Sequence, residues 1–336
     1  MYKIAIAGAS TLVGRELKEV LSDSPLDSAT YALLDEEDAQ GQLDQVGDEA
    51  TFIQAISADA FDRADFTFFC GGESMTRRYW QQALRAGSTV LDLSAALDRE
   101  PGVVVRAPWL GTEAAAVDLF TPAVVPAHPA VVVLALLLQR LQQAAPLHFA
   151  AVTLLEPASE FGRAAMDELH QQTVSLLSFQ SLPRAVYDAQ AAYNLLAGTG
   201  EGSKVNLQEV ATRIRRHYEV LTGGRGPALV VQVIHAPVFH GYTFSIAVEL
   251  DRPVEVAALE EALTGEHVEL VLEDTDSPSN LAATGQEIRR AAGRGKVQGP
   301  RPRRNPARQR TLFQRHPAFL LASIAKRFRS DRSPEP

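Results

Sequence analysis

Two segments of this 336-residue chain carry residue types that could bind a nucleotide or transfer a proton. Residues 3–14 read KIAIAGASTLVG, in which an apolar run ends at a glycine and leads into helical spacing. Residues 235–242 read HAPVFHGY, and VVPAHPA at 124–130 adds a further histidine. Imidazole and phenol groups transfer protons in many enzymes. The first segment therefore indicates a nucleotide-binding turn, and the other segments carry groups that could move a proton.

The glycine turn lies between an expected strand and an expected helix, which is the context that a dinucleotide-binding fingerprint requires. Backbone amides and a helix N-terminus would face a pyrophosphate, and glycine would let the phosphates approach. Thr11 stands at the middle glycine position, where its Cβ could crowd the phosphates. A strand–helix turn that binds nothing is the alternative. The candidate cofactor-binding residues are Gly8, Ser10, Thr11, Leu12, Val13, Gly14, Gly71 and Gly72.

Four consecutive acidic residues, at 35–38, follow the second expected strand. Carboxylates at this point can accept hydrogen bonds from a ribose diol, but they repel a 2′-phosphate. We therefore expect weak binding of NAD or NADP, with NAD favoured. An acidic, solvated loop is the alternative.

The elements that must position these groups follow two patterns. Strands alternate with helices over about the first 125 residues, which predicts a Rossmann-type parallel sheet in an α/β dinucleotide-binding domain. After Pro126 the pattern predicts an α+β domain with a largely antiparallel sheet, whose uncovered face would pair with a second copy in a homodimer. We expect strands at 2–6, 30–34, 66–70, 89–93, 148–155, 228–237, 243–250 and 268–273, and helices at 14–22, 77–86, 131–143, 163–177 and 207–218.

Composition is that of a globular protein, with 46% hydrophobic and 22% charged residues. No apolar run approaches the ~18 residues of a membrane helix. The chain starts directly in an expected strand without a signal peptide, and its single cysteine, Cys70, fits a reducing compartment. We therefore expect a cytoplasmic protein with no membrane contact and no metal site.

The net charge of −9 conceals a basic C-terminal segment: residues 289–336 carry 14 Lys and Arg against two acidic residues. Proline, glycine and arginine dominate 293–310, which predicts disorder, and 317–328 could form one amphipathic helix. The segment could be a nucleic-acid arm, could lie on the acidic body, or could arise from a shifted reading frame; no nucleic-acid partner is expected. The expected domains are 1–127, 128–286 and this tail, 287–336.

Many collinear motifs are similar to those of the aspartate-semialdehyde dehydrogenase family, with greatest similarity to its Usg-like paralogous branch. The resemblance covers about residues 1–287 and ends near Gln286. It rests on GASTLVG, FFCGGES, DLSAALDREP, VVPAHPAVV, EPASEFGRAAMDEL, AYNLL, TRIR, HAPVFHGY and EDTDSPSN.

The resemblance implies that the residues of the family reaction are replaced. His128 stands where the family has its nucleophilic cysteine, and an imidazole cannot form a comparable thioester. His235 replaces the arginine that holds the substrate carboxylate, and Tyr242 replaces the histidine that moves the proton. Glu156 replaces a glutamine that positions the acyl group, and Asp98 an arginine expected to hold phosphate. Cys70 is expected to be a small buried side chain rather than a substitute nucleophile.

Two functions remain open, and no residue is assigned a catalytic role. Residues that act as one catalytic unit are strongly non-additive, so several replacements predict loss of the family reaction. The chain would then be a paralogue that keeps the fold, dimerisation and weak nucleotide binding, with any regulatory role exerted through its surface. The alternative is an active NAD(P)-dependent oxidoreductase that acts on an aldehyde or other carbonyl compound, with Tyr242 or a histidine such as His240 moving the proton.

Overall fold

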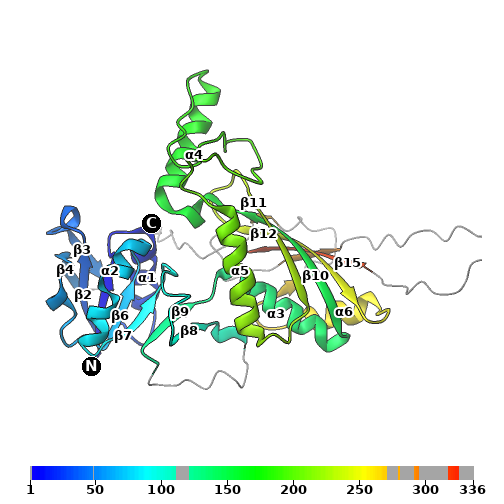
Figure 1. Ribbon diagram of the computed structural model, residues 1–336, viewed down its shortest axis with the longest axis horizontal. Coiled ribbons are helices and arrows are strands. Elements are labelled where there is room, and N and C mark those ends of the chain that lie inside the picture. The colour runs from blue at the N-terminus through cyan, green and yellow to red at the C-terminus, as the bar shows by residue number, and fades with distance from the viewer. Residues whose placement is uncertain are drawn as a thin grey trace, which may run out of the picture. The chain divides into compact units, whose positions relative to one another are not determined.

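The structure is a computed structural model that describes residues 2–47, 49–110, 121–270, 279–280, 291–294 and 317–324. The chain divides into two compact units, Met1–Ala127 and His128–Pro336 (Figure 1). Each unit is built around its own sheet.

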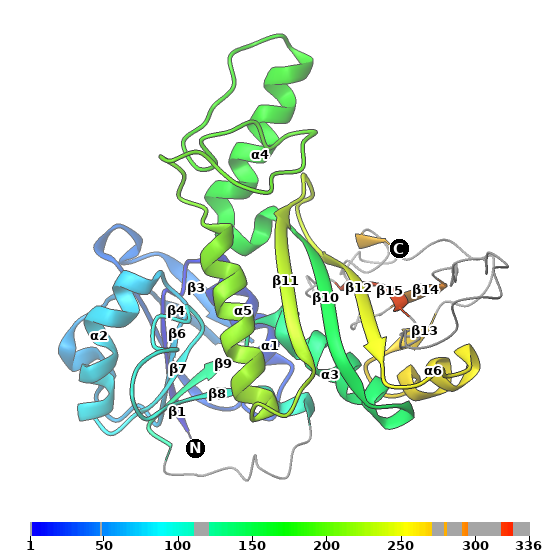
Figure 2. The same cartoon turned by 45° about the vertical axis from the view of Figure 1, so that its right-hand side comes forward.

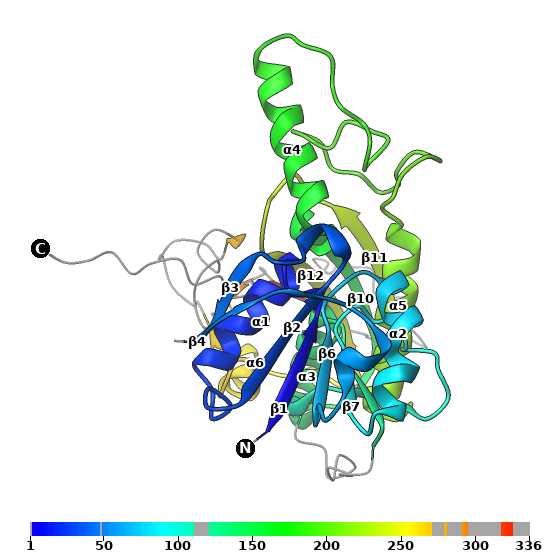
Figure 3. The same cartoon turned by 90° about the vertical axis from the view of Figure 1, so that its left-hand side faces the viewer.

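The first unit contains a seven-stranded sheet in the order β5-β2-β1-β6-β7-β9-β8, with every pairing parallel. Figure 3 shows strands β2, β1, β6 and β7 of this sheet. Parallel sheets are usually buried on both faces, and in β1 the residues from Ile4 to Ala7 are fully buried. The strands are β1 (Lys3–Ala7), β2 (Thr30–Asp35), β5 (Gln54–Ala55), β6 (Phe66–Phe69), β7 (Thr89–Asp92), β8 (Val103–Arg106) and β9 (Ala123–Pro126), with helices α1 (Leu12–Ser22) and α2 (Glu73–Arg85) and a hairpin of β3 (Leu43–Val46) and β4 (Glu49–Phe52).

The second unit contains a six-stranded mixed sheet in the order β11-β10-β12-β15-β14-β13. Strand β10 pairs in parallel with β11 and antiparallel with β12, and β12 pairs antiparallel with β15 (Figure 2). Its strands are β10 (Leu147–Glu156), β11 (Ala228–His235), β12 (Tyr242–Leu250), β13 (Glu269–Leu270), β14 (Ala291–Arg294) and β15 (Pro317–Ile324). Its helices are α3 (Pro129–Ala144), α4 (Gly162–Leu177), α5 (Leu207–Thr222) and α6 (Val256–Leu263).

Alternating burial in β10 shows which face of the second sheet is covered. Ala150, Val152, Leu154 and Glu156 are buried, whereas the residues between them are partly exposed. Helix α5 packs along β11 and α3 packs against both α5 and β10 (Figure 2). The residues on one side of β10 therefore point toward these helices.

The expected fold class is confirmed: a Rossmann-type parallel sheet is followed by an α+β unit with a mixed sheet. The helix expected at 317–328 is wrong, because 317–324 forms β15. A short apolar run does not distinguish a helix from a buried strand by periodicity, and the backbone of β12 offers β15 a complete antiparallel ladder.

Three smaller expectations also need correction. Helix α6 was not expected. The expected strand at 268–273 is seen as Glu269–Leu270, and the rest lies outside the described residues. The disorder expected at 293–310 is wrong for Gly293 and Arg294, which belong to β14; the remainder of that range lies outside the described residues.

None of the helices in the described part of the chain is both long enough and apolar enough to cross a membrane.

Candidate active site

The glycine turn of the first unit joins β1 to α1 beside the loop that joins β6 to α2. Gly8 has φ +87°, and a Cβ added to it would lie 2.3 Å from the amide nitrogen of Gly71. A Cβ on Gly14 would lie 2.3 Å from the carbonyl oxygen of Gly8. Gly72 is the N-cap of α2. The glycines therefore let two helix N-termini start side by side, an arrangement that favours an anion.

Thr11 has a structural role at this turn. It is the N-cap of α1, and its hydroxyl accepts a hydrogen bond from the amide of Gly14 at 3.0 Å. The same hydroxyl lies 2.7 Å from the carbonyl oxygen of Gly8 and 3.0 Å from that of Cys70, to either of which it can donate. A threonine at this position stabilises the start of the helix, which accounts for the missing middle glycine.

The acidic residue that ends β2, Asp35, already binds backbone amides of the protein itself. The Asp35 carboxylate is 5% exposed and accepts hydrogen bonds from the amides of Ser10, at 2.7 Å, and Glu36, at 2.9 Å. The amide of Ser10 is therefore already used. Glu36, Glu37 and Asp38 are exposed, so they remain accessible to a ligand.

In the second unit, strand register brings together three of the residues that the motif resemblance aligns with the family's site. Glu156 and His235 are paired in the register of β10 and β11, and Tyr242 begins β12, next to the pair formed by Leu155 and Thr243. All three are buried, on the helix-covered face of the sheet. The sheet thus collects a carboxyl, an imidazole and a phenol at one end.

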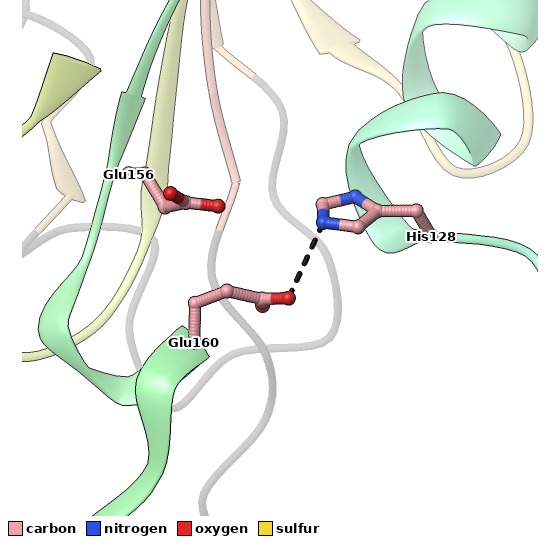
Figure 4. A group of neighbouring side chains, drawn as sticks. All are labelled: His128, Glu156 and Glu160. Atoms are coloured by element: carbon pink, nitrogen blue, oxygen red, sulfur yellow. Dashed lines mark ion pairs between the residues drawn. The ribbon is translucent and has the colours of Figure 1, made fainter. Parts of the chain in front are cut away.

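His128 lies at the start of helix α3, which packs on this face of the sheet. His128 is the N-cap of α3: its Nδ1 accepts from the amide of Ala130 at 3.2 Å, and its own amide donates to Nδ1 of His217 on α5 at 3.0 Å. Its Nε2 lies 3.2 Å from Oε1 of Glu160, which is an ion-pair distance but not a hydrogen-bond geometry. The side chains of His128, Glu156 and Glu160 converge on one point (Figure 4).

Within the cluster of His128, Glu156 and Glu160, Glu156 has the least favourable environment for a negative charge. It is fully buried, and neither carboxylate oxygen has a hydrogen-bond partner among the described residues. Burial raises the pKa of Glu156 well above its ordinary value, and the negative charge of Glu160 raises it further, whereas Arg213 lowers it. In the folded protein this carboxyl therefore favours its protonated form.

Tyr242 is connected to His128 through Glu160. The Tyr242 hydroxyl donates a hydrogen bond to Oε2 of Glu160, while Oε1 of the same carboxylate faces His128. Burial and the neighbouring carboxylates Glu160 and Glu156 hold the pKa of Tyr242 well above 10. Tyr242 can therefore donate a proton in a hydrogen bond, but it is a poor base at neutral pH.

His235 lies in an aromatic environment rather than facing an anion. Its ring is 4.6 Å from that of Tyr187 and 6.2 Å from that of Phe161, and neither ring nitrogen makes a hydrogen bond of good geometry with the described residues. Burial lowers the pKa of His235 to about 4, partly offset by the backbone of Glu156. A neutral imidazole in this setting cannot replace an arginine that binds a carboxylate.

Two residues considered in the sequence analysis do not belong to this cluster, and two residues that do belong to it were not predicted. Cys70 lies in the first unit, is 4% exposed, and burial raises the pKa of its thiol, so it is a poor nucleophile. His240 lies outside β12, which begins at Tyr242. Glu160 and His217 belong to the site, but the sequence analysis did not identify them. The only sequence feature that could have indicated Glu160 is its spacing from Glu156, with a proline between them.

Comparison with known families matches both units. The model described as "Semialdehyde dehydrogenase, NAD binding domain" matches residues 3–156, and "Semialdehyde dehydrogenase, dimerisation domain" matches residues 138–294. The second match runs past Gln286, where the motif resemblance was expected to end.

Comparison with individual proteins indicates the same family. A USG-1 protein homolog of Pseudomonas aeruginosa is 30% identical over 266 residues, 77% of each chain. An aspartate-semialdehyde dehydrogenase of Rickettsia conorii is 25% identical over 266 residues, 78% of this chain and 77% of the other. The solved structure of a probable aspartate-semialdehyde dehydrogenase from Pseudomonas aeruginosa superposes with a TM-score of 0.82 at 25% identity, covering 96% of this chain and 93% of that one.

His235 predicts an acid-dependent loss of stability. Its folded pKa, about 4, lies below its ordinary 6.5, so between these values the unfolded chain binds a proton that the folded chain does not. Stability conferred by the neutral imidazole is present above pH 6.5 and is lost as the pH falls to 4, by up to about 3 kcal/mol. His235→Phe should remove this component from urea unfolding free energies measured between pH 7 and 4.

The matched control is His148→Phe, at a histidine whose side chain is 56% exposed. It should retain the wild-type pH dependence. Parallel pH profiles for wild type and His235→Phe would show that His235 does not titrate in this way.

Proposed function

Because this chain belongs to the semialdehyde dehydrogenase family, we propose that it is a paralogue that keeps the fold, the dinucleotide-binding domain and self-association of the family. In this proposal it no longer performs the cysteine-based, phosphate-dependent oxidation of a semialdehyde. The observation that carries the proposal is His128, a buried imidazole at the helix N-cap where the motif resemblance aligns the nucleophilic cysteine.

The chemistry explains why this one replacement matters. In the acyl-enzyme route a thiolate attacks the aldehyde carbon, hydride passes to the nicotinamide, and phosphate displaces the thiolate from the thioester. The second unit contains no cysteine, and Cys70 has a raised pKa. His235 and Tyr242 also lack the charge or the basicity that the replaced residues would supply.

A nicotinamide dinucleotide is the cofactor that the domain match supports, and the residues of the turn fit it in part. The close approach of Gly8 and Gly71 leaves two helix N-termini for a pyrophosphate, whereas the amide of Ser10 is used by Asp35. When bound, the dinucleotide would supply hydride transfer.

Self-association is proposed from the dimerisation-domain match. We expect a homodimer formed by the second unit. Light scattering of the full chain at micromolar concentration tests this, and the mass of a single chain would contradict it.

A second function is supported by a different observation. The Tyr242 hydroxyl donates a hydrogen bond to Oε2 of Glu160, and Oε1 of the same carboxylate lies 3.2 Å from Nε2 of His128. A small rotation that aligns Nε2 with Oε1 would complete a path for a proton, which could serve an NAD(P)-dependent oxidoreductase that reduces a carbonyl compound directly, without a covalent intermediate. NADH oxidation with a panel of aldehydes and ketones tests it; activity that Tyr242→Phe leaves unchanged would exclude this path.

The main proposal predicts no phosphate-dependent formation of NADH or NADPH from aspartate semialdehyde above background, because no thiolate is available to form the thioester. The measurement is absorbance at 340 nm with both cofactors. His128→Asn, which can retain an N-cap, should give the same baseline. A rate within about a hundredfold of an ordinary enzyme with kcat of about 10 s⁻¹, or an acyl adduct on Cys70, would contradict the proposal.

Cofactor preference gives the next prediction. Carboxylates at 36–38 repel a 2′-phosphate, so isothermal titration should give weak binding with NADH favoured over NADPH by about 1 kcal/mol. Replacing Glu36, Glu37 and Asp38 by their amides should narrow the difference in binding free energy between NADH and NADPH. Glu19→Gln, which removes one exposed carboxylate from α1, is the control and should leave this difference unchanged. Tighter binding of NADPH by the wild type would overturn this assignment.

A further inference from the structure

We propose that His128, Glu156 and Glu160 form a binding site for one divalent transition-metal ion of the zinc class. One atom from each residue, an imidazole nitrogen or a carboxylate oxygen, lies within 4.8 Å of the others. The three side chains come from α3, β10 and the following turn, and they point toward a shared centre (Figure 4). This inference does not depend on whether the thioester reaction has been lost.

The first argument is the absence of partners for Glu156 within the described chain. Its side chain is fully buried, and both of its oxygens lack a hydrogen-bond partner there. Buried carboxylates are normally paired, hydrogen-bonded or bound to a metal. Since Glu156 is directed into the cluster, a cation held between it and Glu160 would give its oxygens a partner.

The second argument is the set of donor atoms. An imidazole nitrogen and two carboxylate oxygens are ligands that Zn²⁺ accepts at about 2.0–2.2 Å. Donors at such distances from one ion lie roughly 3–4 Å apart, so atoms that are separated by 4.8 Å would need to approach each other by about 1–2 Å. Three protein ligands would leave a further coordination position for water.

The third argument is that Glu160 is already oriented for this role. Its Oε2 accepts the hydrogen bond from Tyr242, and its Oε1 lies 3.2 Å from Nε2 of His128. Hydrogen bonds from neighbouring residues commonly orient metal-binding carboxylates in this way. Tyr242 is therefore assigned as a positioning residue for Glu160.

Ligation requires one rearrangement at His128. Its Nδ1 accepts the hydrogen bond from Ala130, so the ring proton is on Nε2, which must be free to bind an ion. The proton must move to Nδ1, and the 3.2 Å bond from Ala130 must break. One neutral hydrogen bond at this distance is a small loss compared with the binding energy of a zinc site.

The sequence did not predict this site, because its residues are not spaced like a known metal motif. His128 and Glu156 are 28 positions apart and belong to different elements. Only the register of β10 with its neighbours and the packing of α3 on the sheet bring them together.

The test uses the full chain after chelator treatment and exchange into metal-free buffer. Titration with Co²⁺, followed by its visible absorption bands and by competition with Zn²⁺, should give one ion per chain. Glu156→Gln should weaken binding by at least about tenfold, and Glu160→Gln should do the same. Circular dichroism and thermal unfolding confirm that each variant is folded, so two independent variants test the site without altering the N-cap of α3.

The matched control is the exposed pair of His148 and Asp251, whose side chains lie 2.9 Å apart in the same unit. His148→Gln should leave the affinity unchanged. The proposal is overturned if the wild type takes up no Co²⁺ or Zn²⁺ at tens of micromolar, or if Glu156→Gln and Glu160→Gln bind as tightly as wild type. Loss of binding in His148→Gln alone would assign the ion to the surface.

Discussion

The repulsion between two neighbouring carboxylates beneath the helices of the second unit is the constraint on which the rest of this site depends. Glu156 is fully buried and Glu160 partly so, and Arg213 is the cation that acts on Glu156 from α5. Two ionised carboxylates in such a setting repel each other and lose solvation. The site must therefore hold a proton or a cation, or else remain a source of instability.

The fold itself brings these polar side chains together. Side chains alternate along strands, so burying the apolar residues of β10, β11 and β12 against α3 and α5 also buries the residue at the strand end. Those end positions carry Glu156, His235 and Tyr242. They therefore form a buried polar centre at one end of the sheet.

Sequence patterns were sufficient to predict the elements that have a clear hydrophobic period and to identify the family. The glycine turn, the parallel sheet and the long strands of the second unit follow from local spacing, and the structure agrees with them. Strand β15 could not be predicted, because a short and mostly apolar run fits a helix or a strand until a sheet edge is available. Glu160 was missed because its importance comes from contacts with Tyr242 and His128, which are distant in sequence.

The unfolding free energy of Glu156→Gln in metal-free buffer tests most directly whether Glu156 is an unpaired buried carboxyl. Its folded pKa is raised, so the wild type has full stability from this group below about pH 4.5 and loses it as the pH rises, by about 1.4 kcal/mol for each unit of pKa shift. Glutamine does not titrate, so the variant should equal or exceed the wild type at pH 8, with the difference shrinking toward pH 4.5. A variant less stable than wild type by about 3 kcal/mol at pH 8 would contradict the account, because it would mean that Glu156 is ionised and firmly paired.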